Sequence, residues 1–406
     1  MSTIEAFYRE AIDLNRYSNK VQFQIASQFN EVILDVLRKI RDVEGNTRAS
    51  EARLQAILSQ MVESLKGWEN ESSIYMIEEM QNLAEFQVGF VQDQLQKVIP
   101  QGEYQVNTVA VSPDFAKSVV TRDPTKLRIR LRDKDGNFRS AQFALTAKRG
   151  SDISLPNGDT VKKSFRGVAE SSASRISRAV KLGVIEGESL QKITKRLKGP
   201  NLRFNSKPQN TIALRSALVN SEGMSLSNRQ IQTVVRTTVN QVQNAASQAV
   251  YAANQDITGQ YQYVATLDAR TSSTCQRLDG QIFKYDQGPV PPQHFNCRST
   301  TVPVVNFDKL QKKYPTLEKP TVGKVVTRPS VKGRVPQNTN YANWLKDNPD
   351  IQDKVLGEKK KYFKFLMSPK RGDKQLNATN ALKKIIREDG TELTLKELAD
   401  KYKDAN

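Results

Sequence analysis

Both cysteines and the only histidine of this 406-residue chain lie in one short segment, CQRLDGQIFKYDQGPVPPQHFNC, residues 275–297. Thiolate and imidazole are ligands that zinc prefers, and His294 and Cys297 are separated by only two residues, as on a single turn. Cys275 would add a third ligand from the preceding segment. The grouping predicts a structural zinc staple that clips a strand, a loop and a turn together.

The fourth ligand is less clearly specified. The nearest carboxylates are Asp268 and Asp279, and water is the other choice. Closed structural zinc sites usually carry four Cys or His ligands, and the segment has no CxxC pair. Simple packing of the three side chains therefore remains an alternative, with a labile disulfide a lesser one.

Catalysis is a sharper alternative for the same residues. A Cys–His pair can act as nucleophile and base, and a zinc-bound histidine can serve a nuclease. One histidine cannot be both ligand and base, however, and no phosphate-binding loop follows in the sequence. The segment thus favours a structural role over an enzymatic one. Further residues are expected to hold its shape through turns, a stiff loop and ion pairs, namely Arg270, Asp279, Gly280, Pro292 and Arg298.

The composition agrees with a protein of the cytoplasm. Two cysteines give no disulfide framework, no run of eighteen apolar residues is present, and the polar start does not resemble a signal peptide. No membrane span is therefore expected.

Charge is distributed unevenly over the chain. Residues 1–100 hold ten Lys and Arg against fifteen Asp and Glu, whereas the remainder holds 52 against 28. Such a basic surface favours a polyanion such as nucleic acid, although a solvated surface or an acidic protein partner is the alternative. The basic residues expected to contact DNA or an acidic partner are Arg128, Arg130, Arg132, Lys359, Lys360 and Lys361.

The periodicity predicts a mainly helical α+β protein. Residues 1–100 show one-sided apolar stripes, which predict a helical bundle with breaks at Gly45 and at Lys66-Gly67. "LRIRLRDKDGNFRSAQFAL" predicts a β-hairpin. The expected parts are a helical N-terminal region (1–100), a β-rich insertion (101–167), an α+β domain with the Cys/His cluster (168–306), a linker (307–340) and an extended basic helical tail (341–406).

An ordered series of motifs resembles the phage Mu F-like minor head, or head morphogenesis, proteins of tailed bacteriophages. It runs through "SLQKITKRL", "VVRTTVNQVQNAA", "LDARTSSTC", "RLDGQIF" and "PPQHFNCRSTTVPV", and the tail with "YANWLKDNPDIQDKVLG" extends it over about 170–406. The chain departs from the family pattern at Thr238, where many relatives are acidic, and at Ser299, where many have a further cysteine. The resemblance implies that a set of motif residues acts together, namely Asp268, Arg270, Cys275, Gly280, His294, Cys297 and Arg298.

The same resemblance implies a non-enzymatic minor structural protein of the virion. Its expected partners are the portal protein, a major capsid or scaffold protein, and packaged double-stranded DNA bound without sequence preference. It would lie in the head interior or at the portal vertex, pass through the host cytoplasm during assembly, and travel with the genome at infection. The alternatives are a metal-dependent nuclease and a toxin-like effector.

Overall fold

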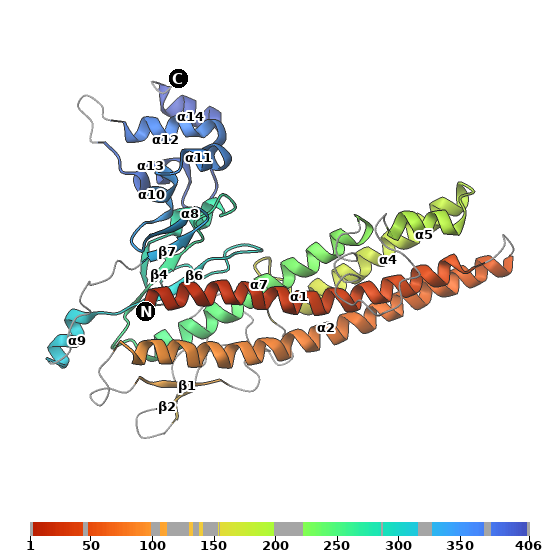
Figure 1. The fold of residues 1–406 in the computed structure, drawn as a ribbon, viewed down its shortest axis with the longest axis horizontal. Coiled ribbons are helices and arrows are strands. Elements are labelled where there is room, and N and C mark those ends of the chain that lie inside the picture. The colour runs from red at the N-terminus through yellow and green to blue at the C-terminus, as the bar shows by residue number, and fades with distance from the viewer. Residues whose placement is uncertain are drawn as a thin grey trace.

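The structure, a computed structural model, describes residues 3–43, 48–98, 106–111, 130–132, 138–140, 153, 155–198, 222–285, 287–315, 327–368 and 375–403. Its main body is a bundle in which long helices run alongside one another (Figure 1). These helices are α1 (Thr3–Arg41), α2 (Arg48–Gln96), α4 (Val161–Ile185) and α7 (Glu222–Ala253), and the shorter α5 (Leu190–Lys198) packs against α1, α4 and α7.

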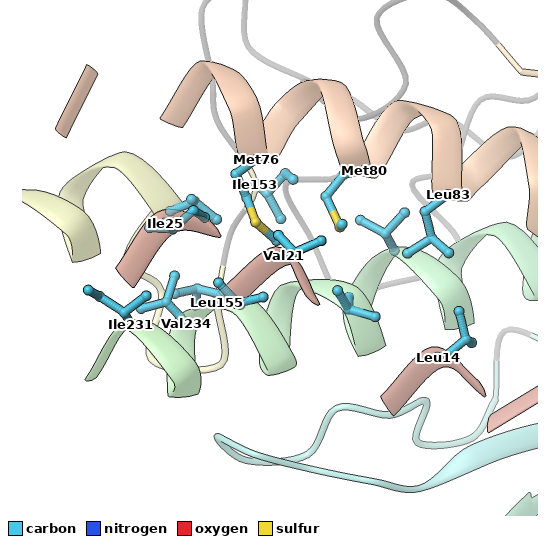
Figure 2. Close-up of a cluster of buried hydrophobic side chains, with 14 of the residues drawn as sticks. Leu14, Val21, Ile25, Met76, Met80, Leu83, Ile153, Leu155, Ile231 and Val234 are labelled. Atoms are coloured by element: carbon cyan, nitrogen blue, oxygen red, sulfur yellow. The ribbon is translucent and has the colours of Figure 1, made fainter. Parts of the chain in front are cut away.

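One continuous apolar core fills the bundle, because each long helix turns an apolar stripe inward. Figure 2 shows how side chains from helices distant in sequence meet there. The labelled residues, all buried, are Leu14, Val21 and Ile25 of α1, Met76, Met80 and Leu83 of α2, Ile231 and Val234 of α7, and Ile153 and Leu155 of the segment before α4. The N-terminal helices therefore share their core with the long helix that precedes the cysteine segment.

The expected helix break at Lys66-Gly67 is wrong, since α2 continues through it. The neighbouring Trp68 is 3% exposed and its ring packs edge-on against Phe29 and Phe165. A glycine inside a helix costs only about 1 kcal/mol relative to alanine, so this tertiary packing outweighs it. The expected break at Gly45 lies among residues 44–47, outside the described ranges.

Small antiparallel sheets accompany the helices. The predicted hairpin is present as β2 (Arg130–Arg132) and β3 (Phe138–Ser140), and β1 (Thr108–Ala110) pairs with the other side of β2. The sheet of the cysteine segment has the order β5-β4-β6, with β4 (Gln260–Val264) between β5 (Ile282–Lys284) and β6 (Thr300–Val304). Helix α9 (Phe307–Lys313) follows it, and β7 (Thr327–Ser330) and β8 (Gly333–Pro336) form a hairpin in the expected linker.

The C-terminal residues are helical as predicted, but they pack into a compact core that also includes Leu267, rather than extend as a tail. Tyr341, Trp344 and Phe363 are each at most 1% exposed in this core. The unit stands at the end of the bundle that holds the N-terminus (Figure 1). Its helices are α10 (Tyr341–Lys346), α11 (Pro349–Leu356), the 3₁₀ turn η2 (Gly357–Lys359), α12 (Lys360–Met367), α13 (Ala378–Ile385) and α14 (Leu395–Lys401).

The architecture is the predicted mainly helical α+β fold with an N-terminal helical bundle and small antiparallel sheets. Among the described residues, no helix is long and apolar enough to span a membrane. The domain boundaries expected from the sequence remain predictions.

Candidate metal centre

The cysteine segment is a short helix and a loop set between strands. Helix α8 (Ser273–Leu278) follows β4 and is capped by Ser272, whose hydroxyl accepts a hydrogen bond from the Cys275 backbone N–H. Such a cap satisfies an otherwise unpaired amide in the first turn. The loop after β5 then brings His294 and Cys297 back over Cys275 before β6 begins.

The structure brings the two thiols and the imidazole together, with their ligand atoms within 4.8 Å of one another. Cys275 Sγ lies 3.7 Å from Cys297 Sγ and 3.3 Å from His294 Nε2. A tetrahedral zinc with Zn–S near 2.3 Å and Zn–N near 2.0–2.1 Å places two sulfurs about 3.8 Å apart and sulfur and nitrogen about 3.5 Å apart. Both cysteines are free and buried. The three side chains can therefore hold a metal ion with little movement.

The histidine is held in the orientation that a metal ligand needs. Its Nδ1 lies 2.8 Å from the Phe295 carbonyl oxygen, so that nitrogen donates its proton there and Nε2 carries the lone pair toward Cys275. Metal-bound histidines commonly have such a second partner. Ser272 Oγ lies 2.7 Å from the same Nε2.

Hydrogen bonding couples the ionisation of the cluster. The hydrogen bond with Cys275 lowers the pKa of Cys297, while that same bond and burial raise the pKa of Cys275. The hydrogen bond to Cys275 also raises the pKa of His294, against the effect of burial. One thiol of the pair thus ionises before the other, and a bound metal would favour the thiolate form of both.

Asp268, the first candidate for a fourth ligand, is not part of the cluster. Its carboxylate accepts hydrogen bonds from both Nη atoms of Arg298, at 2.5 and 2.8 Å, and from the Arg270 backbone N–H at 2.9 Å. The Arg270 side chain is mostly exposed and its Nε lies 3.8 Å from the carboxylate. The fork-shaped pairing with Arg298 holds the pKa of Asp268 below its usual range despite burial.

Asp279 is the second candidate, and it too is engaged elsewhere. It is 4% exposed, and its oxygens accept from the backbone N–H groups of Ala265 and Tyr341 at 2.7 and 2.6 Å. Its charge is balanced by Arg328, with Nη–O distances of 3.0 and 3.1 Å. Arg270 and Arg298, the arginines expected from the sequence to form ion pairs in this segment, both lie beside Asp268 instead. Water is the choice that remains for a fourth metal ligand.

Two other predicted residues shape the loop. Gly280 has φ of +80°, which favours glycine, and a Cβ there would lie 3.1 Å from Asn340 Cβ. Pro292 follows a cis peptide bond from Pro291. Beyond it, Asn296 donates from its backbone N–H to Thr237 Oγ1 of α7 at 3.0 Å, which fixes the loop to the long helix.

The residues proposed to contact DNA are placed in two ways. Arg130 and Arg132 lie in β2, and Arg128 lies outside the described residues. In the C-terminal unit, Lys359 pairs with Glu392, Lys360 with Asp353 at 2.6 Å, and Lys361 lies over the Tyr362 ring at 5.0 Å. These contacts within the chain neutralise part of the positive charge that was expected, from the sequence, to bind DNA or an acidic partner.

Arg328 is the main structural residue of this region that the sequence does not reveal. Besides Asp279, it donates to the Thr339 carbonyl at 2.9 Å and to the Ala265 carbonyl, and its guanidinium lies 5.4 Å from the centre of the Tyr8 ring of α1. In the sequence it stands in a segment rich in Pro, Gly, Lys and Arg, the composition of a linker. Nothing in that pattern distinguishes a buried arginine from a solvated one.

Residues 174–302 match the family described as Phage Mu protein F like protein, and this segment is a Phage Mu F-like domain. No curated protein and no solved structure matches the chain. The match contains α7, β4, β5, the first part of β6 and the whole Cys/His cluster. It implies a phage head morphogenesis or minor capsid protein. The resemblance of residues after 302 to the tail of that family remains a prediction.

Proposed function

We propose that this protein is a non-enzymatic minor structural protein of a tailed-phage head, located at the portal vertex or in the head interior close to packaged DNA. The observation that carries the proposal is the Mu F-like domain over residues 174–302. The position of the Cys/His cluster inside that match supports a role for the cluster in shaping the domain.

Within the domain, we propose that Cys275, His294 and Cys297 bind one zinc ion as a structural staple. The sulfur–sulfur spacing of 3.7 Å supports zinc, and so does the second hydrogen bond of His294. Such an ion would tie α8 to the loop that precedes β6 and would add to folding stability rather than to chemistry. This assignment also accounts for the grouping of the chain's only His and both Cys residues.

The division of charge supports an orientation in the head. The acidic helical region, residues 1–100, would face a portal, capsid or scaffold protein, and the basic remainder would face DNA. Binding to DNA would be independent of sequence and would weaken steeply with salt. Cross-links from α1 or α2 to DNA rather than to a head protein would contradict this orientation.

The test is the protein content of purified virions of the encoding phage, measured by quantitative mass spectrometry beside a deletion of the gene. The expected result is a few copies in each head, cross-links to the portal protein, and fewer infectious particles without the gene. If the protein is lost from the heads after the genome is released, this would show that it is ejected with the DNA. Absence of the chain from virions would contradict the proposal, and so would plasmid cleavage that is lost in His294→Ala.

A further inference from the structure

A large groove runs between α1 and α2 on the acidic helical region. Its cavity of about 600 Å³ is large enough for several side chains, and its walls are mainly apolar. Phe86 is 60% exposed there and its ring stacks on that of Phe90 at 6.5 Å. The groove is lined by Ala6, Arg9, Glu10, Asp13, Leu14, Tyr17, Glu79, Asn82, Leu83, Phe86, Phe90 and Gln94.

A buried carboxylate with no partner lines this groove. Glu10 is 6% exposed, and within the described part of the chain neither of its oxygens has a hydrogen-bond partner. The amide of Gln87 lies beside it, donates one N–H to Ser247 Oγ at 2.9 Å, and leaves its own oxygen unpaired among the described residues. Buried polar groups are normally paired, and once Glu10 is ionised these unpaired oxygens are all acceptors. The groove therefore lacks a donor.

The charges around Glu10 do not supply that donor. Arg9 pairs with Glu5 at 3.1 Å, Asp13 pairs with Arg16 at 3.1 Å, and Glu79 accepts from the Tyr17 hydroxyl. From α7, the group facing Glu10 is the buried phenol of Tyr251, whose pKa is raised by burial. Besides Glu10, the lining holds the carboxylates of Asp13 and Glu79 against one arginine, so it is acidic and attracts a cation.

We propose that this groove is the docking site for an apolar helical segment of a partner protein that presents one lysine or arginine to Glu10. The α2 residues of the lining run from Glu79 to Gln94, a rise of roughly 20 Å, which matches a partner helix of about fifteen residues. Aliphatic stems of Lys and Arg pack on apolar walls while their end groups reach a polar partner. The inference rests on the proposed head function, in which this region faces another protein.

The test uses the full chain and two synthetic helical peptides of fifteen residues, built of leucine, alanine and glutamine. One carries a central lysine and the other carries norleucine at that position. Calorimetry is expected to show at least about tenfold tighter binding of the lysine peptide. Glu10→Gln should abolish this difference. Glu31→Gln, at an exposed acidic position on the same helix, should preserve it.

Two further measurements keep the test independent of folding. Phe86→Ala changes an exposed side chain, so it should weaken both peptides without changing the circular dichroism spectrum. Burial raises the pKa of Glu10 to about 8, so lysine binding at pH 6.5 should release about one proton, measured in buffers of different ionisation enthalpy. Equal affinity of the two peptides, or no binding, would overturn the proposal.

Other occupants give distinct results. If the wild type is a dimer and Glu10→Gln is a monomer, the groove binds a second copy of the chain. That result would overturn the proposal that a different protein docks there. Equal incorporation of the wild type and Glu10→Gln into virions would overturn docking at this groove and leave the head function standing. Absence of both proteins from virions would contradict the head function, while peptide binding would still support the groove.

Discussion

The cysteine segment and the N-terminal helices differ in whether their buried carboxyl groups have partners. In the segment, Asp279 is enclosed by Arg328 and two backbone N–H groups, so its charge is fully partnered. In the helices, Glu10 is equally buried and has no hydrogen-bond partner among the described residues. A buried charge that is paired fixes the local geometry. A buried carboxylate that is not paired is stable only when it is protonated or when a ligand supplies the missing partner. The first region is therefore a scaffold, and the second is a surface for binding.

The scaffold also joins parts of the chain that are far apart in sequence. Arg328 of β7 contacts Tyr8 of α1, and the hydroxyl of Tyr341 donates to the Asp268 carbonyl at 2.9 Å. Ser273 of α8 donates to the Gly390 carbonyl at 2.6 Å. The helix that carries Cys275 is thus fastened to the C-terminal unit, and the candidate metal centre lies where the bundle, sheet and C-terminal unit meet.

The largest expected effect comes from removing the scaffold's most buried charge. Asp279→Ala leaves Arg328 buried without its counter-charge, so the free energy of unfolding should fall by about 3–5 kcal/mol. Denaturant unfolding followed by circular dichroism measures it, and Asp353→Ala on the surface is the matched control. A loss below about 1 kcal/mol would show that the pair does not hold the scaffold.

Asp268 should matter less, because its partner Arg298 is partly exposed and water screens the charge of the pair. Asp268→Asn should cost about 1–2 kcal/mol at pH 7. Since Arg298 lowers its pKa below the ordinary 3.8, the stabilisation is present above that value and is lost as the pH falls through the folded pKa. Unfolding midpoints of wild type and Asp268→Asn should converge once the pH falls below the folded pKa of Asp268. A difference that persists there would contradict the ion pair.

Glu10 should show the opposite dependence on pH. Its folded pKa of about 8 exceeds the ordinary 4.5, so the wild type loses stability as the pH rises between these values. Glu10→Gln should match the wild type at pH 4 and exceed it by roughly 1 kcal/mol or more at pH 9. Thermal unfolding across this range measures the effect. Parallel curves for the two proteins would mean that Glu10 has a partner after all.

The smallest effect is expected on the surface of the C-terminal unit. Lys360 pairs with Asp353, whose side chain is 64% exposed. Because exposed pairs contribute little, Lys360→Ala should change the free energy of unfolding by less than about 1 kcal/mol. A larger loss, in the same denaturant experiment, would make this pair part of the scaffold.

The sequence predicted the parts of the fold that depend on local pattern. Apolar periodicity predicted the bundle, alternation predicted the β2–β3 hairpin, and the grouping of rare residues predicted that Cys275, His294 and Cys297 would meet. The continuity of α2 through Gly67 was not predictable in this way, because it depends on packing of Trp68 against helices elsewhere in the chain.

The sequence also could not show which charged residues form ion pairs with one another. The positions of Asp268 and Asp279 near the cysteines suggested that they bind a metal. Only the fold shows that Asp268 pairs with Arg298 and Asp279 with Arg328. Glu10 resembles any solvated glutamate of an amphipathic helix until α2 and α7 are packed beside it. Long-range pairing leaves little trace in the local sequence, because the same residue types serve both surface and core.

The zinc site proposed for the cysteine segment can be tested by the metal content of the purified full chain, measured by inductively coupled plasma mass spectrometry. About one zinc per chain is expected. It should be lost in Cys275→Ser and in His294→Ala but retained in Asp268→Asn, because the Asp268 carboxylate pairs with Arg298 and not with the metal. Wild-type protein without bound metal would contradict the proposed site.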